Sequence, residues 1–314
     1  MFTSEAGKQI GDRILSHAPD IRNSLAAAFE TSIVGVGSEV TFFRNLLSRI
    51  KTNLETLHLP DVSFTCRLVE THQKPRVAVT HPRIFSCELA DLLIVIKYRI
   101  GPEIVEKASQ LYQVKLCKWN SEECTIDQNQ LELLSDWPPF EFGRLAQGGV
   151  RQYRIRPKTL EFGSYMLMLR SPLPRHYVKC QSHFCNFQSY GVSPHALAVR
   201  RLGPSSVNIS TFPFALSSSD AFFNHLALER GEHNSLNPEI NDLVAALYRH
   251  LGLDPDPPGE FDGFLGKPLE DEPGFAILEI AVNGGEQSGG SGVRKMEKEV
   301  PPRKDSGVKS DRKK

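Results

Sequence analysis

Apolar residues recur at helical spacing through the first part of the chain. The apolar positions of the first stretch are Leu15, Ile21, Leu25 and Phe29. They predict helix over residues 4–31. A second helix is expected over 39–57, because Ser38 can cap it and the acidic Glu39 that follows suits the positive end of the helix dipole. We therefore expect the chain to begin with helices that flank a sheet.

The next segments have the short, β-branched pattern of strands. Strands are expected over 63–70, 74–80, 88–98 and 110–119. The stretch 88–98 (ELADLLIVIKY) is the strongest, since it is apolar on both faces, as a central strand is. Residues 99–109 are predicted to form a loop. A helix is expected over 127–134, ended by Trp137-Pro138-Pro139.

The second half predicts further strands and a pair of helices. Strands are expected over 159–170, 195–202 and 274–282, and helices over 219–230 and 238–251. The second of these helices is opened by Asn237-Pro238, which suit the cap and first turn. The last thirty or so residues are rich in Gly, Ser and charge and predict disorder.

These elements predict an α/β fold with a mixed central sheet flanked by helices. We divide the chain into a core with N-terminal helices (1–145), an α/β extension with a basic and then an acidic segment (146–284), and a disordered tail (285–314). The final predicted strand of the extension is expected to complete the same sheet. A chain of 314 residues can bury a sizeable core in this way.

Charge is balanced overall, with 37 basic and 37 acidic residues, but it is unevenly placed. Residues 140–205 carry ten basic and two acidic side chains, a net charge of +8, and 216–286 carry three and fourteen, a net charge of −11. Such asymmetry can mark a face that binds a polyanion. The alternative is that the two segments lie against each other in the fold and cancel.

The six cysteines and the N-terminal sequence favour a reduced, cytoplasmic protein without membrane association. Several of the cysteines lie in apolar, strand-like runs, as buried thiols do. The start of the chain lacks the apolar segment of a signal peptide, and no apolar run approaches the roughly 20 residues that span a bilayer.

One group of residues has the composition of a metal-dependent phosphodiesterase site. Asp91 enters a strongly apolar strand and Glu88 lies three residues earlier, while Gln113 and Lys115 share one face of the next strand. Asp91, Glu88 and Gln113, with the Val114 carbonyl, offer the hard oxygen ligands that Mg²⁺ or Mn²⁺ takes. Lys115 can orient the attacking water or stabilise charge on a phosphate.

Two more residues can assist. Glu39 on the preceding helix can add a metal contact, directly or through another group, and Gln130 on the following helix can bind phosphate or water. A structural interpretation stays open for each of these residues. Asp91 and Lys115 on adjacent strands can form an ordinary cross-strand ion pair, and Glu88 and Asp91 can cap a turn.

The order of these elements resembles the PD-(D/E)xK nuclease superfamily, and most closely its Mrr-like restriction endonucleases, in which Gln replaces the acidic residue before x-Lys. The matching residues are Asp91, Gln113-Val114-Lys115 and Gln130, within about residues 38–140. The resemblance implies a restriction-endonuclease-like core and cleavage of DNA, or RNA, in bacterial defence or DNA processing. The sequence departs from the pattern in the long interval between Asp91 and Gln113, and Gln113 removes a negative charge from the metal site.

Other signals are weaker. On a strand, Arg154, Arg156 and Lys158 would share one face and, with Arg151, could contact phosphates, although a charged edge strand has the same pattern. Residues 180–185 (CQSHFC) have a zinc-like spacing, but structural zinc takes four ligands and an ordinary loop is the simpler interpretation.

The sequence therefore predicts a Mg²⁺-dependent (or Mn²⁺-dependent) nuclease whose partner is nucleic acid, and DNA first. The rival hypothesis is a non-catalytic nucleic-acid-binding or assembly subunit with a degenerate nuclease fold. A homodimer, or a subunit active only within a larger complex, is compatible with both.

Overall fold

The computed structural model describes most of the two α/β segments of the chain. The residues described are 4–32, 39–71, 74–116, 124–142, 152–156, 162–170, 187–192, 197–201, 206–211, 218–227, 232–233, 237–253 and 274–285. The predictions for the tail, for CQSHFC, for Arg151 and for Lys158 fall outside these residues.

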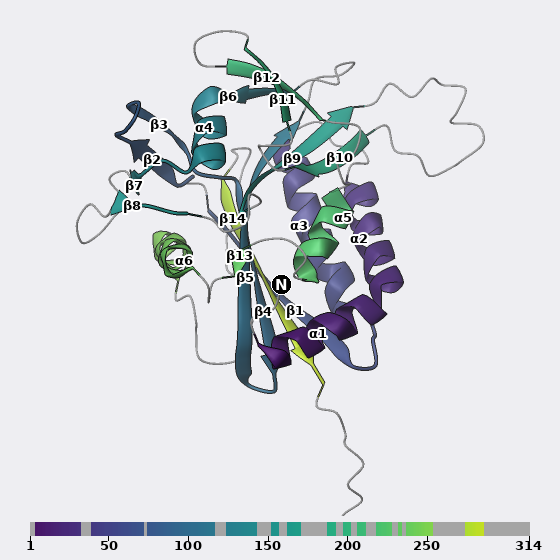
Figure 1. Cartoon of the computed structure of the whole chain (residues 1–314). Coiled ribbons are helices and arrows are strands. Elements are labelled where there is room, and N and C mark those ends of the chain that lie inside the picture. Colours follow the sequence, from purple (N-terminus) through teal and green to yellow (C-terminus); the bar gives the residue numbers. More distant parts are fainter. Residues whose placement is uncertain are drawn as a thin grey trace, which may run out of the picture.

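A mixed sheet forms the centre of the molecule (Figure 1). Its strands, in spatial order, are β1 (Val62–Thr71), β14 (Phe275–Gly284), β4 (Leu92–Ile100), β5 (Glu103–Leu116), β9 (Gly163–Arg170) and β10 (Phe187–Val192), and β13 (Glu232–His233) also pairs with β5. β14 is antiparallel to β1 and parallel to β4, β4 and β5 are antiparallel, and β5 and β9 are parallel. The predicted α/β fold with a mixed sheet flanked by helices is confirmed.

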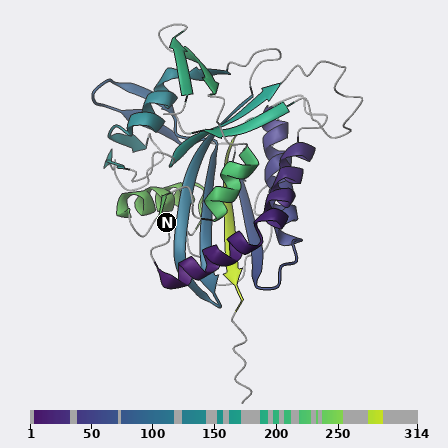
Figure 2. The ribbon, with the colours of Figure 1, turned by 45° about the vertical axis from the view of Figure 1, so that its right-hand side comes forward.

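Helices cover both faces of this sheet. On one face lie α1 (Glu5–Ser16), α2 (Ala18–Ser32), α3 (Glu39–Glu55) and α5 (Ser218–Leu226). On the other lie α4 (Gln128–Asp136) and α6 (Pro238–His250). Figure 2 shows the purple N-terminal helices together on their side of the sheet. We call these the N-helix face and the α4/α6 face.

Two small sheets complete the α4/α6 side. One is formed, in spatial order, by β3 (Phe85–Glu88), β2 (Arg76–Val79), β7 (Phe140–Phe142) and β8 (Gln152–Tyr153). The other is formed by β11 (Leu197–Arg201), β12 (Ser206–Thr211) and β6 (Cys124–Asp127). The β2–β3 hairpin leads directly into β4, so it lies beside the point where that central strand begins.

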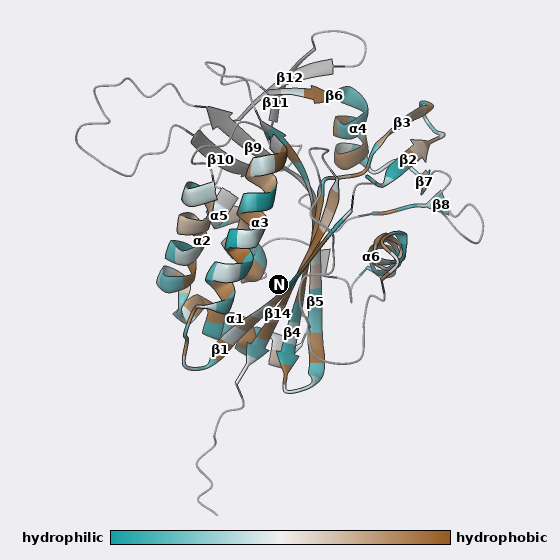
Figure 3. Ribbon diagram, turned by 180° about the vertical axis from the view of Figure 1, so that it is seen from behind, coloured by the Kyte–Doolittle hydropathy of each residue, from teal (hydrophilic) through white to brown (hydrophobic). Residues whose placement is uncertain are grey.

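The central strands are apolar on both faces because both faces are covered. In β4, Leu92 and Ile94 pack into the core of the N-helix face, whereas Leu93 and Val95 pack into the core of the α4/α6 face. Figure 3 shows the resulting apolar colouring along β4 and β14. Alternation of this kind leaves no solvent-facing side, as expected for a strand buried between two layers. The expected contribution of the last strand to the same sheet is confirmed, since β14 lies between β1 and β4.

The prediction of a loop over 99–109 is wrong. The chain turns tightly at Gly101, which has a φ of 57°, and Glu103 already begins β5 opposite Ile100. Two polar residues of β5 near this turn, Glu106 and Gln110, are buried and find partners elsewhere in the fold. Glu106 accepts a hydrogen bond from Ser4 Oγ at 3.3 Å, and Gln110 donates to Ser164 Oγ at 3.0 Å.

The hairpin explains the interval between Asp91 and Gln113. β4 and β5 are long strands joined by a tight turn, so their register places Leu92 opposite Tyr112 and brings Asp91 next to Gln113. The predicted continuous strand over 88–98 is also interrupted. Glu88 ends β3 in a small sheet, and β4 begins only after Asp91.

Several helix ends follow the sequence signals. Asp127 caps α4 by accepting a hydrogen bond from Asn129 N at 2.7 Å, and α4 ends at Trp137 in a left-handed conformation. Asn237 caps α6, with Pro238 in its first turn. The predicted helix over 4–31 is instead two helices, because the first ends at His17.

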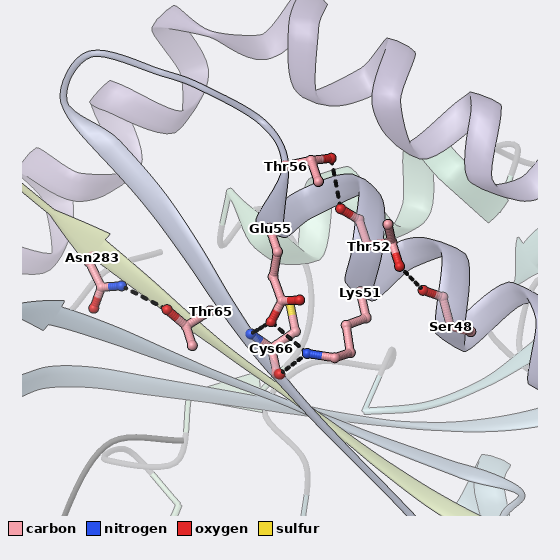
Figure 4. Close-up of polar contacts among 8 residues, drawn as sticks. All are labelled: Ser48, Lys51, Thr52, Glu55, Thr56, Thr65, Cys66 and Asn283. Atoms are coloured by element: carbon pink, nitrogen blue, oxygen red, sulfur yellow. Dashed lines mark hydrogen bonds and ion pairs between the residues drawn. The ribbon is translucent and has the colours of Figure 1, made fainter. Parts of the chain in front are cut away.

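The helix α3 is held to β1 by a small polar network (Figure 4). Lys51 Nζ donates to Glu55 Oε1 at 2.6 Å and to the Cys66 carbonyl at 2.8 Å, and Cys66 N donates to Glu55 Oε1 at 2.9 Å. Burial raises the pKa of the Cys66 thiol, so this cysteine is a packing residue. Among the described helices, none is long and apolar enough to cross a membrane.

We predict that Gly163→Ala destabilises the protein by about 1–3 kcal/mol, as overpacking does. A Cβ at this position would lie 2.8 Å from Leu134 Cδ2 and 2.8 Å from Trp137 Cζ2. Urea unfolding of the variant tests the effect. Gly285→Ala is the control, because its nearest atom would be 3.6 Å away, and it should change stability by less than about 0.5 kcal/mol. Equal midpoints for the two variants would contradict this packing.

Candidate functional site

Asp91 is a buried carboxylate at the entrance to β4. Its backbone is fixed on both sides, because Asp91 N donates to the Tyr112 carbonyl at 3.0 Å and Ala276 N donates to the Asp91 carbonyl at 3.0 Å. Its side chain shares the α4/α6 face with Leu93 and is 6% exposed. A charge in such a place requires partners, since an unpaired carboxylate in an apolar surrounding is very unfavourable.

The carboxylate of Asp91 has three partners. Lys74 Nζ lies 2.8 Å from Oδ1. Val114 N donates to Oδ2 at 2.8 Å, and Gln113 Nε2 also donates to Oδ2. Both oxygens are therefore satisfied, one by a cation and one by the strand on which the predicted Gln-x-Lys residues lie.

Gln113 connects Asp91 to the following helix. It is 0% exposed, and while Nε2 donates to Asp91, Oε1 accepts a hydrogen bond from Gln130 Nε2 at 2.9 Å. Gln130 Nε2 also lies 3.4 Å from the Glu88 carbonyl oxygen. The structure thus brings together Asp91, Gln113, Gln130 and the backbone of Glu88, which the sequence had proposed as parts of one site.

Lys74 is the residue that the sequence analysis missed. Its Nζ lies 2.9 Å from Glu88 Oε2 as well as 2.8 Å from Asp91 Oδ1, so it bridges the two acids. Burial lowers the pKa of Lys74, but the charge of Asp91 and hydrogen bonds to Asp91 and Glu88 outweigh this, and the net pKa is raised. The ammonium is therefore charged at neutral pH.

Only the fold places Lys74 here. It lies two residues before β2, and the β2–β3 hairpin folds back so that Leu89 N donates to the Pro75 carbonyl at 2.8 Å. That pairing puts Lys74 beside Glu88, fourteen residues further along the chain. The sequence did offer one signal for Lys74, since a lysine stands just before a hairpin whose other end is acidic. This signal can be used only once the hairpin is known.

Lys115 lies on the same face of β5 as Gln113, two residues further on, and is half-buried. Among the residues that the structure describes, no ion pair joins it to Asp91. The cross-strand ion pair considered for Asp91 and Lys115 is thus formed by a different lysine, Lys74. Lys115 borders the cluster without neutralising it.

The other predicted assistants are placed differently. Glu39 begins α3, whose core residues Phe42 and Leu46 pack on the N-helix face, opposite the side to which Asp91 belongs. The side chain of Glu39 lies outside the described residues. Arg154 and Arg156 are exposed and alternate with the buried Tyr153 and Ile155, so they share one face as predicted.

The donor set of the cluster can be compared with what a divalent ion requires. Within the described ranges, no group of three or more His, Cys, Asp or Glu side chains gathers around one point. The cluster provides two carboxylates, from Asp91 and Glu88, and the amide oxygen of Gln113. These are hard oxygen donors of the kind that Mg²⁺ takes, and the two carboxylates already hold a cation, the Lys74 ammonium, between them.

A second polar cluster is buried further along the same face. Lys97 Nζ lies 2.7 Å from Glu279 Oε1, and Tyr248 Oη donates to Glu279 Oε2 at 2.6 Å. The side chains of Lys97 and Glu279 are only 3% and 1% exposed. This cluster fastens α6 to β4 and β14. It is not a candidate site, because solvent and substrates cannot reach it.

We predict that Gln113→Leu lowers the free energy of unfolding by about 1–3 kcal/mol, because Asp91 loses a donor and Gln130 loses its acceptor in a buried place. Urea unfolding measures it. The control is Gln128→Leu, since Gln128 makes only a bond within α4, to Glu132 at 2.9 Å, worth about 0.5 kcal/mol or less. Equal losses in both variants would show that the buried chain of amides adds nothing.

Comparison with known proteins leaves the function to be argued from this geometry. No protein-family model, no curated protein and no solved structure matches the chain. The function is therefore inferred from Asp91, the residues that hold its carboxylate, and Lys115 beside them.

Proposed function

We propose that the protein is a metal-dependent nuclease whose site is centred on Asp91. One observation carries the proposal. Four residues from separate elements or junctions meet in one hydrogen-bonded cluster at the start of β4, namely Asp91, Glu88, Gln113 and Gln130. Lys115 lies on the same face. The observed order of α3, β4, β5 and α4 also agrees with the order on which the resemblance to PD-(D/E)xK nucleases depends.

The residues divide into two roles. Asp91, Glu88 and the amide oxygen of Gln113 would hold a Mg²⁺ or Mn²⁺ ion, which when bound supplies Lewis acidity and an acidified water. Gln113 would have to turn its amide, since its nitrogen now faces Asp91. Val114 N keeps the Asp91 carboxylate directed at one point.

Lys115 would act on the water or the phosphate. Within the described part of the chain no hydrogen bond or ion pair engages its side chain, and it is half-buried beside the acidic cluster. An ammonium in that position can orient a water for in-line attack and stabilise negative charge that develops on phosphate oxygens. This is the task that the sequence pattern assigns to it.

The substrate we propose is nucleic acid, with DNA first. Arg154 and Arg156 are exposed on one face of the segment around β8, which pairs with β7 in the same small sheet as Glu88. Arginine side chains in such a row suit the phosphates of a nucleic-acid backbone. Their contribution would be to binding strength, and it should fall as salt concentration rises.

Cleavage of plasmid and single-stranded DNA with Mn²⁺ or Mg²⁺ tests the proposal. Asp91→Ala should lower the rate more than about 100-fold, as loss of a principal ligand does, and Lys115→Ala about 100-fold or more. Lys51→Ala is the control, because Lys51 interacts with Glu55 and Cys66 on the N-helix face, and its rate should equal that of the wild type. Equal cleavage by all four proteins would rule out this site.

A second function is favoured by one specific observation, the ion pairs that Lys74 forms with both Asp91 and Glu88. A site whose acids already have a counter-ion can persist as part of a binding or assembly subunit without catalysis. This alternative would be selected over the nuclease by two results together. The wild type would bind DNA, more weakly after Arg154→Ala, and it would not cleave DNA under any metal condition.

Gln113→Glu should tighten binding of Mn²⁺ by about tenfold or more, because it adds a carboxylate beside Asp91. It also introduces the acidic residue that the PD-(D/E)xK pattern has at this position and this chain lacks. Without metal the same variant should be less stable than the wild type, since two carboxylates would then be in contact. Calorimetric titration and urea unfolding measure the two effects. A variant that binds Mn²⁺ no more tightly than the wild type would contradict a metal position next to residue 113.

A further inference from the structure

The cation between Asp91 and Glu88 is supplied by the protein itself. Lys74 Nζ lies 2.8 Å from Asp91 Oδ1 and 2.9 Å from Glu88 Oε2, and the other Asp91 oxygen is used by Gln113 and Val114 N. The position between the two acids is therefore the one at which a positive charge is best stabilised, and an ammonium already occupies it.

A divalent ion cannot share this position with Lys74. Oxygen–metal distances for Mg²⁺ are about 2.0–2.1 Å, so an ion bound to Asp91 Oδ1 and Glu88 Oε2 would lie in the space that Nζ now fills. Repulsion between the two cations also opposes joint occupancy, and low solvent exposure strengthens that repulsion. A metal ion can therefore enter this position only as the Lys74 ammonium leaves it.

Lys74 can leave without unfolding of the sheet. It lies before β2 and outside the regular strands, and its side chain is 12% exposed, while that of Glu88 is 32% exposed. Lys74 and Glu88 are thus the more exposed members of the cluster, and Asp91 and Gln113 are its inner members. Rotation of a long lysine side chain is enough to carry the charge outward.

We propose that Lys74 is a resident counter-ion of the metal site, and that a divalent cation binds by displacing its ammonium from Asp91 and Glu88. This inference rests on the proposed metal site. It assigns Lys74 the role of setting the affinity of that site. Without metal, Lys74 compensates one of the two negative charges of the site, and competition with the lysine raises the concentration of divalent ion at which the site fills.

The first experiment measures Mn²⁺ binding by calorimetry for the wild type, Lys74→Met and Lys51→Met. Removing the competing ammonium should tighten Mn²⁺ binding by about tenfold or more, or about 1.4 kcal/mol. Lys51→Met is the matched control, since Lys51 also pairs with a glutamate, Glu55 at 2.6 Å, but on α3 (Figure 4), and it should bind as the wild type does. The double variant Asp91→Asn with Lys74→Met should lose binding, which places the ion at Asp91.

A second experiment needs no variant and keeps the proposal testable if Lys74→Met does not fold. An amine-acetylating reagent is applied to the wild type with and without saturating Mn²⁺, and the acetylation of each lysine is followed by mass spectrometry. Lys74 should react slowly without metal, because its ammonium is held by two carboxylates, and several-fold faster with metal. Lys51 should react at the same rate in both conditions.

The outcomes separate this inference from the proposed function. Faster acetylation of Lys74 on addition of Mn²⁺ supports displacement even if no DNA is cleaved, and in that case only the nuclease proposal fails. Mn²⁺ binding that leaves Lys74 acetylation unchanged, or equal Mn²⁺ affinity in wild type and a folded Lys74→Met, overturns displacement while leaving cleavage to be judged on its own. Absence of Mn²⁺ binding in every folded protein overturns both.

Discussion

The burial of the Asp91 carboxylate constrains the structure around it more than any other interaction. The Asp91 side chain is only 6% exposed, so its carboxylate needs compensation on both oxygens, and two segments provide it. The β2–β3 hairpin must fold back to bring in Lys74, and β5 must lie in the register that presents Gln113 and Val114 N. The position of α4 follows in turn, because Gln130 completes the bonding of Gln113.

Charge balance gives Gln113 a clear role. Lys74 supplies one positive charge to the two carboxylates of Asp91 and Glu88, and a glutamate at 113 would add a third carboxylate without a further cation. The glutamine instead donates to Asp91 and accepts from Gln130, which an acid could not do when ionised. An uncharged residue at position 113 therefore suits a cluster in which Lys74 is the cation that pairs with Asp91.

The sheet provides the rigidity that such a cluster needs. β4 is paired along its length by β14 and β5 and is covered on both faces, so Asp91 at its entrance has little freedom to move. The second buried group, formed by Lys97, Glu279 and Tyr248, secures α6 over the same face. It costs desolvation, but it fixes which part of α6 lies over which part of β4 and β14.

The sequence by itself determined the elements whose signals are local or periodic. The two-faced apolar pattern of 92–98, the caps at Asp127 and Asn237, and the shared face of Gln113 and Lys115 all follow from side-chain spacing. Only the tertiary structure decided the rest. It showed the tight turn at Gly101, where Ile100 pairs with Glu103, and it supplied partners from far along the chain for the buried Glu106 and Gln110. It also selected Lys74 over Lys115 as the partner of Asp91, since a contact between residues seventeen apart depends on how a hairpin folds back, which no local pattern specifies.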